Sequence, residues 1–494
     1  MILVLMISIL LAGGMICWLV ARTNPTLAKW IALVAVGVDW VLISYLWLQH
    51  SGAAAGDDWM IHYQQSWIPA FGISFHLALD GLSVILLWLT FFLGTLAVLC
   101  SWNEIRERTG FYFFNLLWTL AGIAGVFVAL DLFLFYVFWE VMLIPMYFLI
   151  SLWGDTNRRY AAFKFFIFTQ AGGLLMLVAI LALYFVHGNQ TGAYTFDYFN
   201  LLNTSIQPAT ARWIMLGFLI AFAVKLPVVP FHNWLPDAHS EAPTAGSLIL
   251  AGLLLKTGAY GMIRFVLPLF PQAAATIASW AMLLGVVGIL YGAFLAYAQT
   301  DLKRLIAYTS VSHMGFVMLG IFSFREMALQ GVVIQLIAHG ISTGALFVMA
   351  GMLKERLHTR DINRMGGLWT AMPGMGGVAM LFTMASLGLP ALGNFIAEFL
   401  ILMGAFPAHA TYTVLATLGL VFSALYSLRL MQKVFLGPSV AEEPVPDLSR
   451  REGLIMAALG IGIVLLGLYP QPVLDMTRSV VEQVTGNKIA VAWR

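Results

Sequence analysis

The chain has 494 residues, of which 61% are hydrophobic and only 10% charged, and its mean hydropathy is +0.90. This composition excludes a water-soluble globular protein and indicates a polytopic membrane protein. The formal net charge of +2 speaks against binding to nucleic acid. The two cysteines, Cys17 and Cys100, are too few for an iron–sulfur cluster, a cysteine-rich zinc site or a disulfide framework.

Apolar stretches long enough to cross about 30 Å of hydrocarbon recur along the whole chain, so we expect an all-α fold with about fourteen transmembrane helices. The first stretch, residues 2–21, has no basic region before it and no small-residue cleavage site, and it therefore predicts a retained helix rather than a signal peptide. The expected helices are centred near Ala12, Val38, Phe91, Ala121, Val141, Leu174, Leu219, Leu255, Val286, Ser312, Ala338, Leu387, Leu420 and Gly462.

The basic residues between these stretches predict the orientation of the chain. The loops on the side of the first loop carry 17 Lys and Arg residues and the opposite side carries 6, while Lys225 and Lys256 lie inside spans. Cytoplasmic loops are the ones enriched in Lys and Arg. An even number of spans places both termini on one side, so we expect both outside the cytoplasm.

Polar stretches between the spans predict surface segments rather than a soluble domain. Residues 50–80 hold Asp57 and Asp58 but no basic residue, and residues 73–79 alternate apolar and polar or small side chains, which predicts a short strand on the outer face. Residues 188–207 and 437–450 predict surface loops, and residues 470–494 predict a short segment on the outer surface.

Two spans, the seventh and the twelfth, are interrupted by proline. Lys225-Leu-Pro227 lies in the seventh, and Gly388-Leu-Pro390 lies in the twelfth, with Glu398 after it. A proline removes a backbone donor and clashes with the preceding turn, so both helices should be discontinuous. Five spans separate the breaks, which suggests a five-helix unit used twice with opposite orientation.

Ionisable side chains in the middle of spans are the most informative residues of this sequence. Each central charge would cost about 2.5–3.5 kcal/mol facing lipid, so these side chains should face the bundle interior, pair, or lie in water. We expect Glu140 to lie opposite Lys225, where each would control the proton affinity of the other, and a histidine suits a proton relay. The candidate proton-translocation residues are Glu140, Lys225, Lys256, His313, His339 and Glu398.

Three structural interpretations of the same residues stay open at this point. Lys225 could reach the membrane surface along its own side chain, a buried Glu–Lys pair could only hold helices together, and each histidine could be a hydrogen-bonded core residue.

Seven motifs of this sequence belong together: Trp139-Glu140, residues 225–244 (KLPVVPFHNWLPDAHSEAPT), 255–258 (LKTG), 301–304 (DLKR), 310–315 (SVSHMG), 339–343 (HGIST) and 394–398 (NFIAE). They resemble the antiporter-like L, M and N subunits of NADH:quinone oxidoreductase (respiratory complex I) and the large subunits of multisubunit sodium/proton antiporters. Glu398 matches the M (chain 4) branch, where the other branches typically carry lysine, and a long extension after the last span, as in L, is absent from this sequence.

This resemblance implies a bundle of fourteen helices with two inverted five-helix repeats and discontinuous helices 7 and 12. It implies export of protons across the bacterial inner membrane, driven by quinone reduction elsewhere in the complex. Glu140 would modulate Lys225, and protons would pass Lys256, His313 and His339 toward Glu398. The implied divisions are residues 1–109 for helices 1–3 and an outer loop, 110–265 and 276–436 for the two repeats with their proton half-channels, and 450–494 for the last helix and an outer tail.

The resemblance also implies which groups belong to other subunits. No cofactor is expected in this chain, since FMN, the iron–sulfur clusters and quinone would be bound by partner subunits. The expected partners are the L and N subunits and the lipid bilayer.

Three rival functions follow from the same residues. A sodium/proton antiporter subunit shares the lysine and broken-helix chemistry, but Glu398 speaks against it. A membrane cytochrome would use His313 and His339 as haem ligands, although one histidine per helix does not suit two stacked haems. A scaffold would use its buried charges only to hold helices together.

Overall fold

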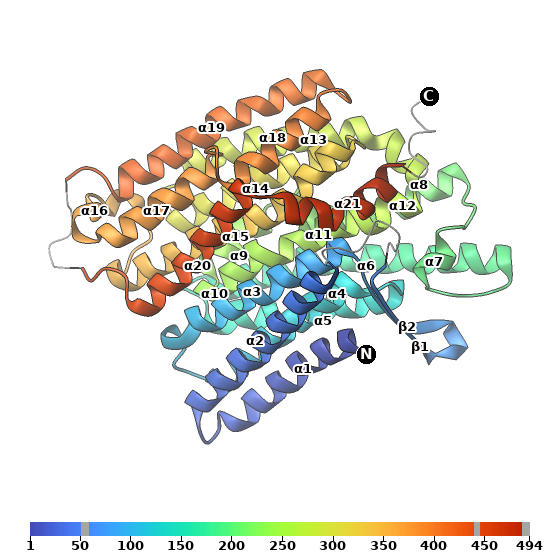
Figure 1. Ribbon diagram of the computed structural model, residues 1–494, viewed down its shortest axis with the longest axis horizontal. Coiled ribbons are helices and arrows are strands. Elements are labelled where there is room, and N and C mark those ends of the chain that lie inside the picture. Colours follow the sequence, from blue (N-terminus) through green and yellow to red (C-terminus); the bar gives the residue numbers. More distant parts are fainter. Residues whose placement is uncertain (51–58, 439–444, 487–494) are drawn as a thin grey trace.

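The computed structural model describes residues 1–50, 59–438 and 445–486. Figure 1 shows long helices running side by side along the molecule, with a β-hairpin near one end of the bundle and α16 at the other. The long helices are α1 (Ile2–Val20), α2 (Pro25–His50), α3 (Gly81–Glu104), α4 (Thr109–Val128), α5 (Leu132–Trp153), α6 (Arg158–Thr191), α8 (Pro208–Lys225), α13 (Pro271–Ala298), α14 (Leu302–Ile321), α15 (Glu326–Leu357), α17 (Pro373–Ser386), α18 (Gly393–Ala405), α19 (Ala410–Val434), α20 (Arg450–Leu468) and α21 (Gln471–Gly486). The short elements are α7 (Tyr198–Leu201), α9 (Trp234–Glu241), α10 (Thr244–Ile249), α11 (Leu255–Gly261), α12 (Leu267–Leu269), α16 (Leu368–Ala371), the π-helical segments η2 (Leu250–Leu254) and η3 (Met262–Val266), and the 3₁₀ turns η1 (Pro69–Phe71) and η4 (Ile362–Arg364).

The predicted all-α membrane fold is confirmed. Within the described residues, twelve helical stretches are long and apolar enough to cross a membrane. Two more crossings expected from the sequence are more polar or shorter: α14, which carries His313, and the broken pair α17 and α18. The division into two inverted repeats, and the residue ranges assigned to them, stay a prediction.

Both expected helix breaks are present. Helix α8 ends at Lys225, and the freed carbonyl of Val224 accepts a hydrogen bond of 2.9 Å from the indole of Trp234. Helix α17 ends at Ser386, and Gly388 has a φ of +84°, a left-handed conformation that glycine adopts without strain. Backbone groups released inside a membrane bundle must find such protein partners, which keeps both breaks stable.

The surface segments were predicted less accurately. Strand β2 (Ile73–Leu79) has the expected bounds, but it pairs with an unpredicted antiparallel strand, β1 (Ile61–Ile68). The expected loop at 188–207 is partly wrong, because α6 continues to Thr191 and α7 begins at Tyr198. Of the expected loop at 437–450, residues 439–444 lie outside the described residues, as do Asp57 and Asp58.

The amphipathic helix α21 forms most of the expected terminal segment. It packs against α3 and α15, and the carbonyl of Met476 lies so close to Gly81 that any side chain there would collide with it. Residues 487–494 lie outside the described part of the chain. The helix therefore lies at the end of the bundle where α3 begins.

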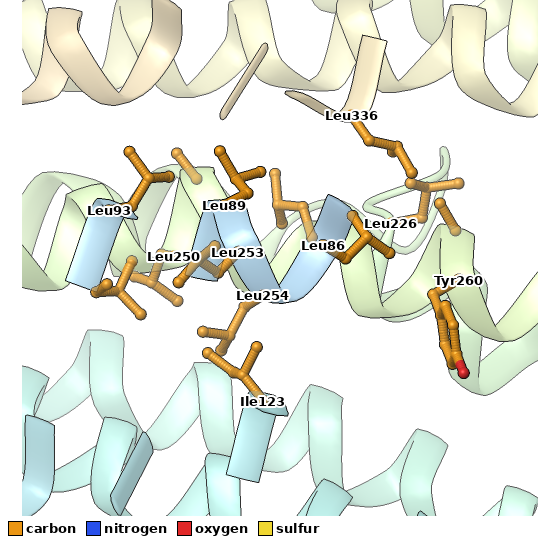
Figure 2. Packing of buried hydrophobic residues seen from close by; sticks show 14 of the residues in the cluster. Leu86, Leu89, Leu93, Ile123, Leu226, Leu250, Leu253, Leu254, Tyr260 and Leu336 are labelled. Atoms are coloured by element: carbon orange, nitrogen blue, oxygen red, sulfur yellow. The ribbon is translucent and has the colours of Figure 1, made fainter. Parts of the chain in front are cut away.

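Apolar side chains fill the centre of the bundle. Figure 2 shows Leu86 and Leu89 of α3 beside Leu253 of η2, with Leu226, at the break after α8, near the helix that carries Tyr260. These side chains are at most 1% exposed. The polar groups described next are therefore surrounded by a closely packed apolar core.

Candidate functional site

Lys256 and His339 form a hydrogen-bonded pair at the centre of the molecule. Lys256 is on α11, between the two π-helical segments, and its ammonium Nζ lies 2.7 Å from Nδ1 of His339 on α15. The ammonium also donates to the carbonyl of Ala251. Both side chains are fully buried, and Nε2 of His339 has no hydrogen-bond partner among the residues that the structure describes. One nitrogen of the pair is thus free to take part in a further proton transfer.

His313 and Glu398 form a second buried pair. Nδ1 of His313, on α14, lies 2.8 Å from Oε1 of Glu398, on α18, and both side chains are 2% exposed. Ser386, at the end of α17, lies 3.2 Å from Nε2 of the same histidine. The amide of Gln335 donates to the carboxylate at 3.3 Å, and the Tyr426 hydroxyl lies 3.4 Å from the histidine. The second helix break therefore places Glu398 and Ser386 next to the two ring nitrogens of His313.

The two pairs are neighbours. The rings of His313 and His339 have centroids 5.7 Å apart and cross at 68°. Lys256, His339, His313 and Glu398 therefore lie next to one another in this order, and we call these four residues the central line. Four of the six residues expected from the sequence are brought together in it.

Lys225 and Glu140 are placed differently from the expectation. Lys225, on α8, is fully buried, and its ammonium has no hydrogen-bond partner within residues 1–50, 59–438 and 445–486; the rings of Trp139 and Phe165 lie 5.2 and 5.4 Å away. Glu140, on α5, is half-buried and accepts a hydrogen bond of 3.3 Å from Gln170. Glu140 is near enough to attract the Lys225 ammonium through space, but the expected direct pair is not formed.

A buried ion pair near the hairpin was missed by sequence reasoning. Arg264 pairs with Asp80, which caps α3, and its Nε lies 3.4 Å from the hydroxyl of Tyr260. The guanidinium also lies 4.7 Å above the ring of Trp59. The spacing of Lys256, Tyr260 and Arg264, four residues apart, was the available signal that they share one helix face.

Two further acids are buried at this end of the bundle, which we call the hairpin end after residues 61–79. Asp197 lies 2.5 Å from the imidazole of His76 on β2. Burial raises the pKa of Asp131, which precedes α5, although the backbone N–H groups of Ser74 and Leu134 donate to its carboxylate and oppose the shift. The hairpin is thus fixed to the helices by buried polar contacts.

The opposite end carries a network of half-buried and buried charges, and we call it the basic end after Lys354 and Arg360. Arg360 pairs with Asp155 at 2.9 Å, with Asp301 at 3.0 Å and with Glu241 at 3.3 Å. Lys354 also pairs with Asp155. Asp155 and Asp301 lie in connections and Glu241 ends α9, so the three acids are far apart in the sequence and no spacing could have revealed that they meet.

The arrangement suits proton transfer better than metal chemistry. In the described part of the chain, no group of three or more His, Cys, Asp or Glu side chains is placed to hold a metal ion. Both ring nitrogens of His313 are engaged by Glu398 and Ser386. Imidazole, carboxyl and amine groups in hydrogen-bond contact are the groups that exchange protons near neutral pH.

Comparison with known proteins gives a consistent result. Residues 129–423 match a family model described as "NADH:quinone oxidoreductase/Mrp antiporter, TM". A curated relative, NADH-quinone oxidoreductase subunit M of Pseudomonas aeruginosa, is 55% identical over 488 residues, which cover 97% of this chain and 96% of that protein.

Solved structures show the same fold. A chain of respiratory complex I from Thermus thermophilus with bound NADH superposes with a TM-score of 0.89 at 32% identity, covering 98% of this chain and 99% of that one. A chain of the Mrp complex from Dietzia has a TM-score of 0.85 at 21% identity, covering 99% of each chain, and shows likeness of fold alone. The resemblance drawn from the motifs is confirmed. This chain belongs to the subunit M family of NADH-quinone oxidoreductase, as a membrane subunit of that proton-pumping complex.

Proposed function

We propose that this chain carries protons through the membrane, coupled to quinone reduction in other subunits, by way of Glu140, Lys225 and the central line. FMN, the iron–sulfur clusters and quinone are bound by those other subunits, and the L and N subunits are the neighbours of this chain. The observation that carries the proposal is the central line, which places an amine, two imidazoles and a carboxyl group side by side in the buried core.

The central line works as a relay because each member can hold a proton and pass it to the next. Lys256 gives a proton to His339, the proton moves to His313, and Glu398 receives it. The two ring centroids lie 5.7 Å apart and no direct hydrogen bond joins the described rings, so this transfer requires a water molecule that bridges them. Each transfer changes the charge of both the donor and the acceptor. The new charge then changes the proton affinity of the next group in the line.

Lys225 supplies the switch at the other helix break. Its ammonium makes no hydrogen bond to the described residues, so the charged form depends on the rings of Trp139 and Phe165 and on the field of Glu140. Moving or neutralising the Glu140 carboxylate would release the proton of Lys225, and an adjacent subunit could do so because Glu140 is only half-buried.

The basic end faces the cytoplasm in this proposal. Both termini and the hairpin then lie on the periplasmic side of the bacterial inner membrane. The excess of Lys and Arg in the loops of the basic end supports this orientation.

Glu398→Gln tests the proposal, because glutamine keeps the size and hydrogen-bonding capacity of the side chain but cannot carry the proton. We expect the assembled complex to lose coupled NADH:quinone turnover and proton pumping in sealed vesicles. Glu326→Gln, the same change at an exposed position on α15, is the matched control and should behave as wild type. Pumping at the wild-type rate by Glu398→Gln would contradict the proposal.

The same vesicles test the antiporter alternative. Assays in sodium-free buffer should leave proton pumping unchanged. Exchange of sodium for protons without NADH oxidation would instead favour a sodium/proton antiporter.

A further inference from the structure

Gln335, on α15, contacts the carboxylate of the central line without being one of its four members. Its side chain is fully buried, and its amide Nε2 donates to Oε1 of Glu398 at 3.3 Å. The same carboxylate oxygen lies 2.8 Å from Nδ1 of His313. Two groups from two different helices, α14 and α15, therefore hold the acidic end of the central line.

A close helix contact fixes the position of Gln335 relative to Glu398. Gly331 lies one helical turn before Gln335 on α15. A Cβ atom on Gly331 would lie 2.7 Å from the backbone nitrogen of Ile401 and 2.8 Å from the carbonyl oxygen of Ala397, both on α18. Helices approach so closely only where one of them lacks a side chain. Because Ala397 directly precedes Glu398, this contact keeps the carboxylate within reach of the Gln335 amide.

The chemistry of the carboxylate fixes the direction of the Gln335 amide. An ionised carboxylate only accepts hydrogen bonds, so the amide nitrogen must face Glu398 and the amide oxygen must point away. That oxygen has no partner among the described residues, and neither has Nε2 of His339. His339 follows Gln335 by four residues on α15, a spacing at which side chains are neighbours. One water molecule between these two atoms would satisfy both, as buried polar atoms require.

From this geometry we propose that Gln335 is a positioning residue that keeps Glu398 ready to accept a proton. This inference rests on the proposed function and adds to it a residue that carries no proton itself. The amide nitrogen holds the carboxylate beside His313, and an N–H donor stabilises a carboxylate more than a neutral acid. The amide oxygen holds the water molecule beside His339.

The titratable groups around Glu398 come from three helices. His313 on α14 contacts the carboxylate directly, His339 on α15 lies beyond His313, and Tyr426 on α19 is within electrostatic range. The sequence of α17 contains no charged residue, and that of α20 contains charged residues only in its first turn. Loss of the Gln335 donor should therefore be visible as a change in the pH dependence of turnover.

Gln335→Met tests the proposal, because methionine keeps most of the side-chain volume but has no N–H group to donate. Without that donor, Glu398 stays protonated up to a higher pH and cannot accept a proton there. The pH at which coupled NADH:quinone turnover falls to half on the acid side should therefore rise by about one pH unit. Turnover and proton pumping are measured in sealed vesicles, after assembly of the complex has been confirmed on a native gel.

A second variant and a control separate positioning from packing. Gln335→Asn keeps the amide but shortens the side chain by one methylene group, so the amide no longer reaches Glu398. It should show the same shift, whereas a role that any buried amide can fill predicts the wild-type profile. Gln330→Met, at a half-buried glutamine on the same helix that is bonded to Glu326, is the matched control and should keep the wild-type profile.

Glu398→Gln is the reference that separates this inference from the proposed function. If Glu398→Gln loses pumping while Gln335→Met lowers turnover by the same factor at every pH, or keeps the wild-type profile, the positioning role is wrong and the central line stands. A wild-type profile for Gln335→Asn overturns the positioning role in the same way. If Glu398→Gln itself pumps normally, both proposals are wrong.

Discussion

The buried pair of Arg264 and Asp80 gives the prediction whose size follows most directly from the structure. The side chains of the two residues are 3% and 1% exposed. Replacing one partner leaves the other charge buried and uncompensated, which typically costs about 3–5 kcal/mol. Arg264→Met also removes the contact over Trp59, so we expect a loss of about 3–5 kcal/mol in the free energy of unfolding.

A double-mutant cycle separates the pair from the individual side chains. Asp80→Asn alone leaves the Arg264 guanidinium buried without its carboxylate and should lower the free energy of unfolding by a similar amount. Replacing both charges of a buried pair often leaves the free energy of unfolding nearly unchanged. The double variant should therefore be less destabilised than either single variant, with a coupling free energy of roughly 3 kcal/mol or more.

Equilibrium unfolding of the chain in bicelles by added detergent measures all three variants. Arg478→Met is the control, because Arg478 pairs with Asp475 on the surface of α21 at 2.9 Å, where such pairs contribute about 0–1 kcal/mol. Destabilisation by Arg264→Met no greater than that of the control, or simple additivity in the cycle, would refute the reasoning.

Two other predictions concern a close helix contact and a helix cap. A Cβ atom on Gly258 would lie 2.6 Å from the carbonyl oxygen of Phe222 and 2.8 Å from the backbone nitrogen of Leu226, so Gly258→Ala should destabilise the protein at the break after α8 by about 1–3 kcal/mol. Gly37→Ala is the control, because a Cβ atom there would meet nothing within 4 Å and should not destabilise the protein. Thermal unfolding of both variants checks this. Burial opposes ionisation of Asp447, but backbone N–H groups of Gly374, Leu448 and Met375 lower its pKa below the ordinary 3.8. Its carboxylate therefore stabilises the start of α17 above about pH 4, and that contribution disappears as the pH falls through the folded-state pKa. Asp447→Asn should cost about 0.3–1 kcal/mol at pH 7 and progressively less below pH 4, measured by unfolding as a function of pH, and a deficit independent of pH would contradict the assignment.

Charged residues of the core could be identified from the sequence because a charge is conspicuous in an apolar span. Lys256 and Glu398 are the clearest examples, and both lie in the central line. The uncharged partners Ser386 and Gln335 could not be identified, since serine and glutamine in a membrane helix have no distinctive spacing. A side chain without charge becomes informative only when its neighbours are known.

The sequence could not show which side chains of different helices contact each other. Glu140 and Lys225 were expected to pair, but they lie on α5 and α8, and the rotation of one helix against another is set by packing. The same limit explains why the three acids around Arg360 were missed. Strand β1 was missed for a different reason, because residues 61–68 show no clean alternation of apolar and polar side chains.

Lys225 offers the most direct test of whether the buried charges carry protons or only hold helices together. Its ammonium forms no hydrogen bond in the described part of the chain, so Lys225→Met removes the charge without breaking a hydrogen bond seen there and keeps most of the side-chain volume. The measurement is NADH:quinone turnover together with the proton gradient in sealed vesicles, after assembly of the complex has been confirmed on a native gel. We predict a fully assembled complex that has lost both activities, whereas turnover and pumping at wild-type rates would contradict the account.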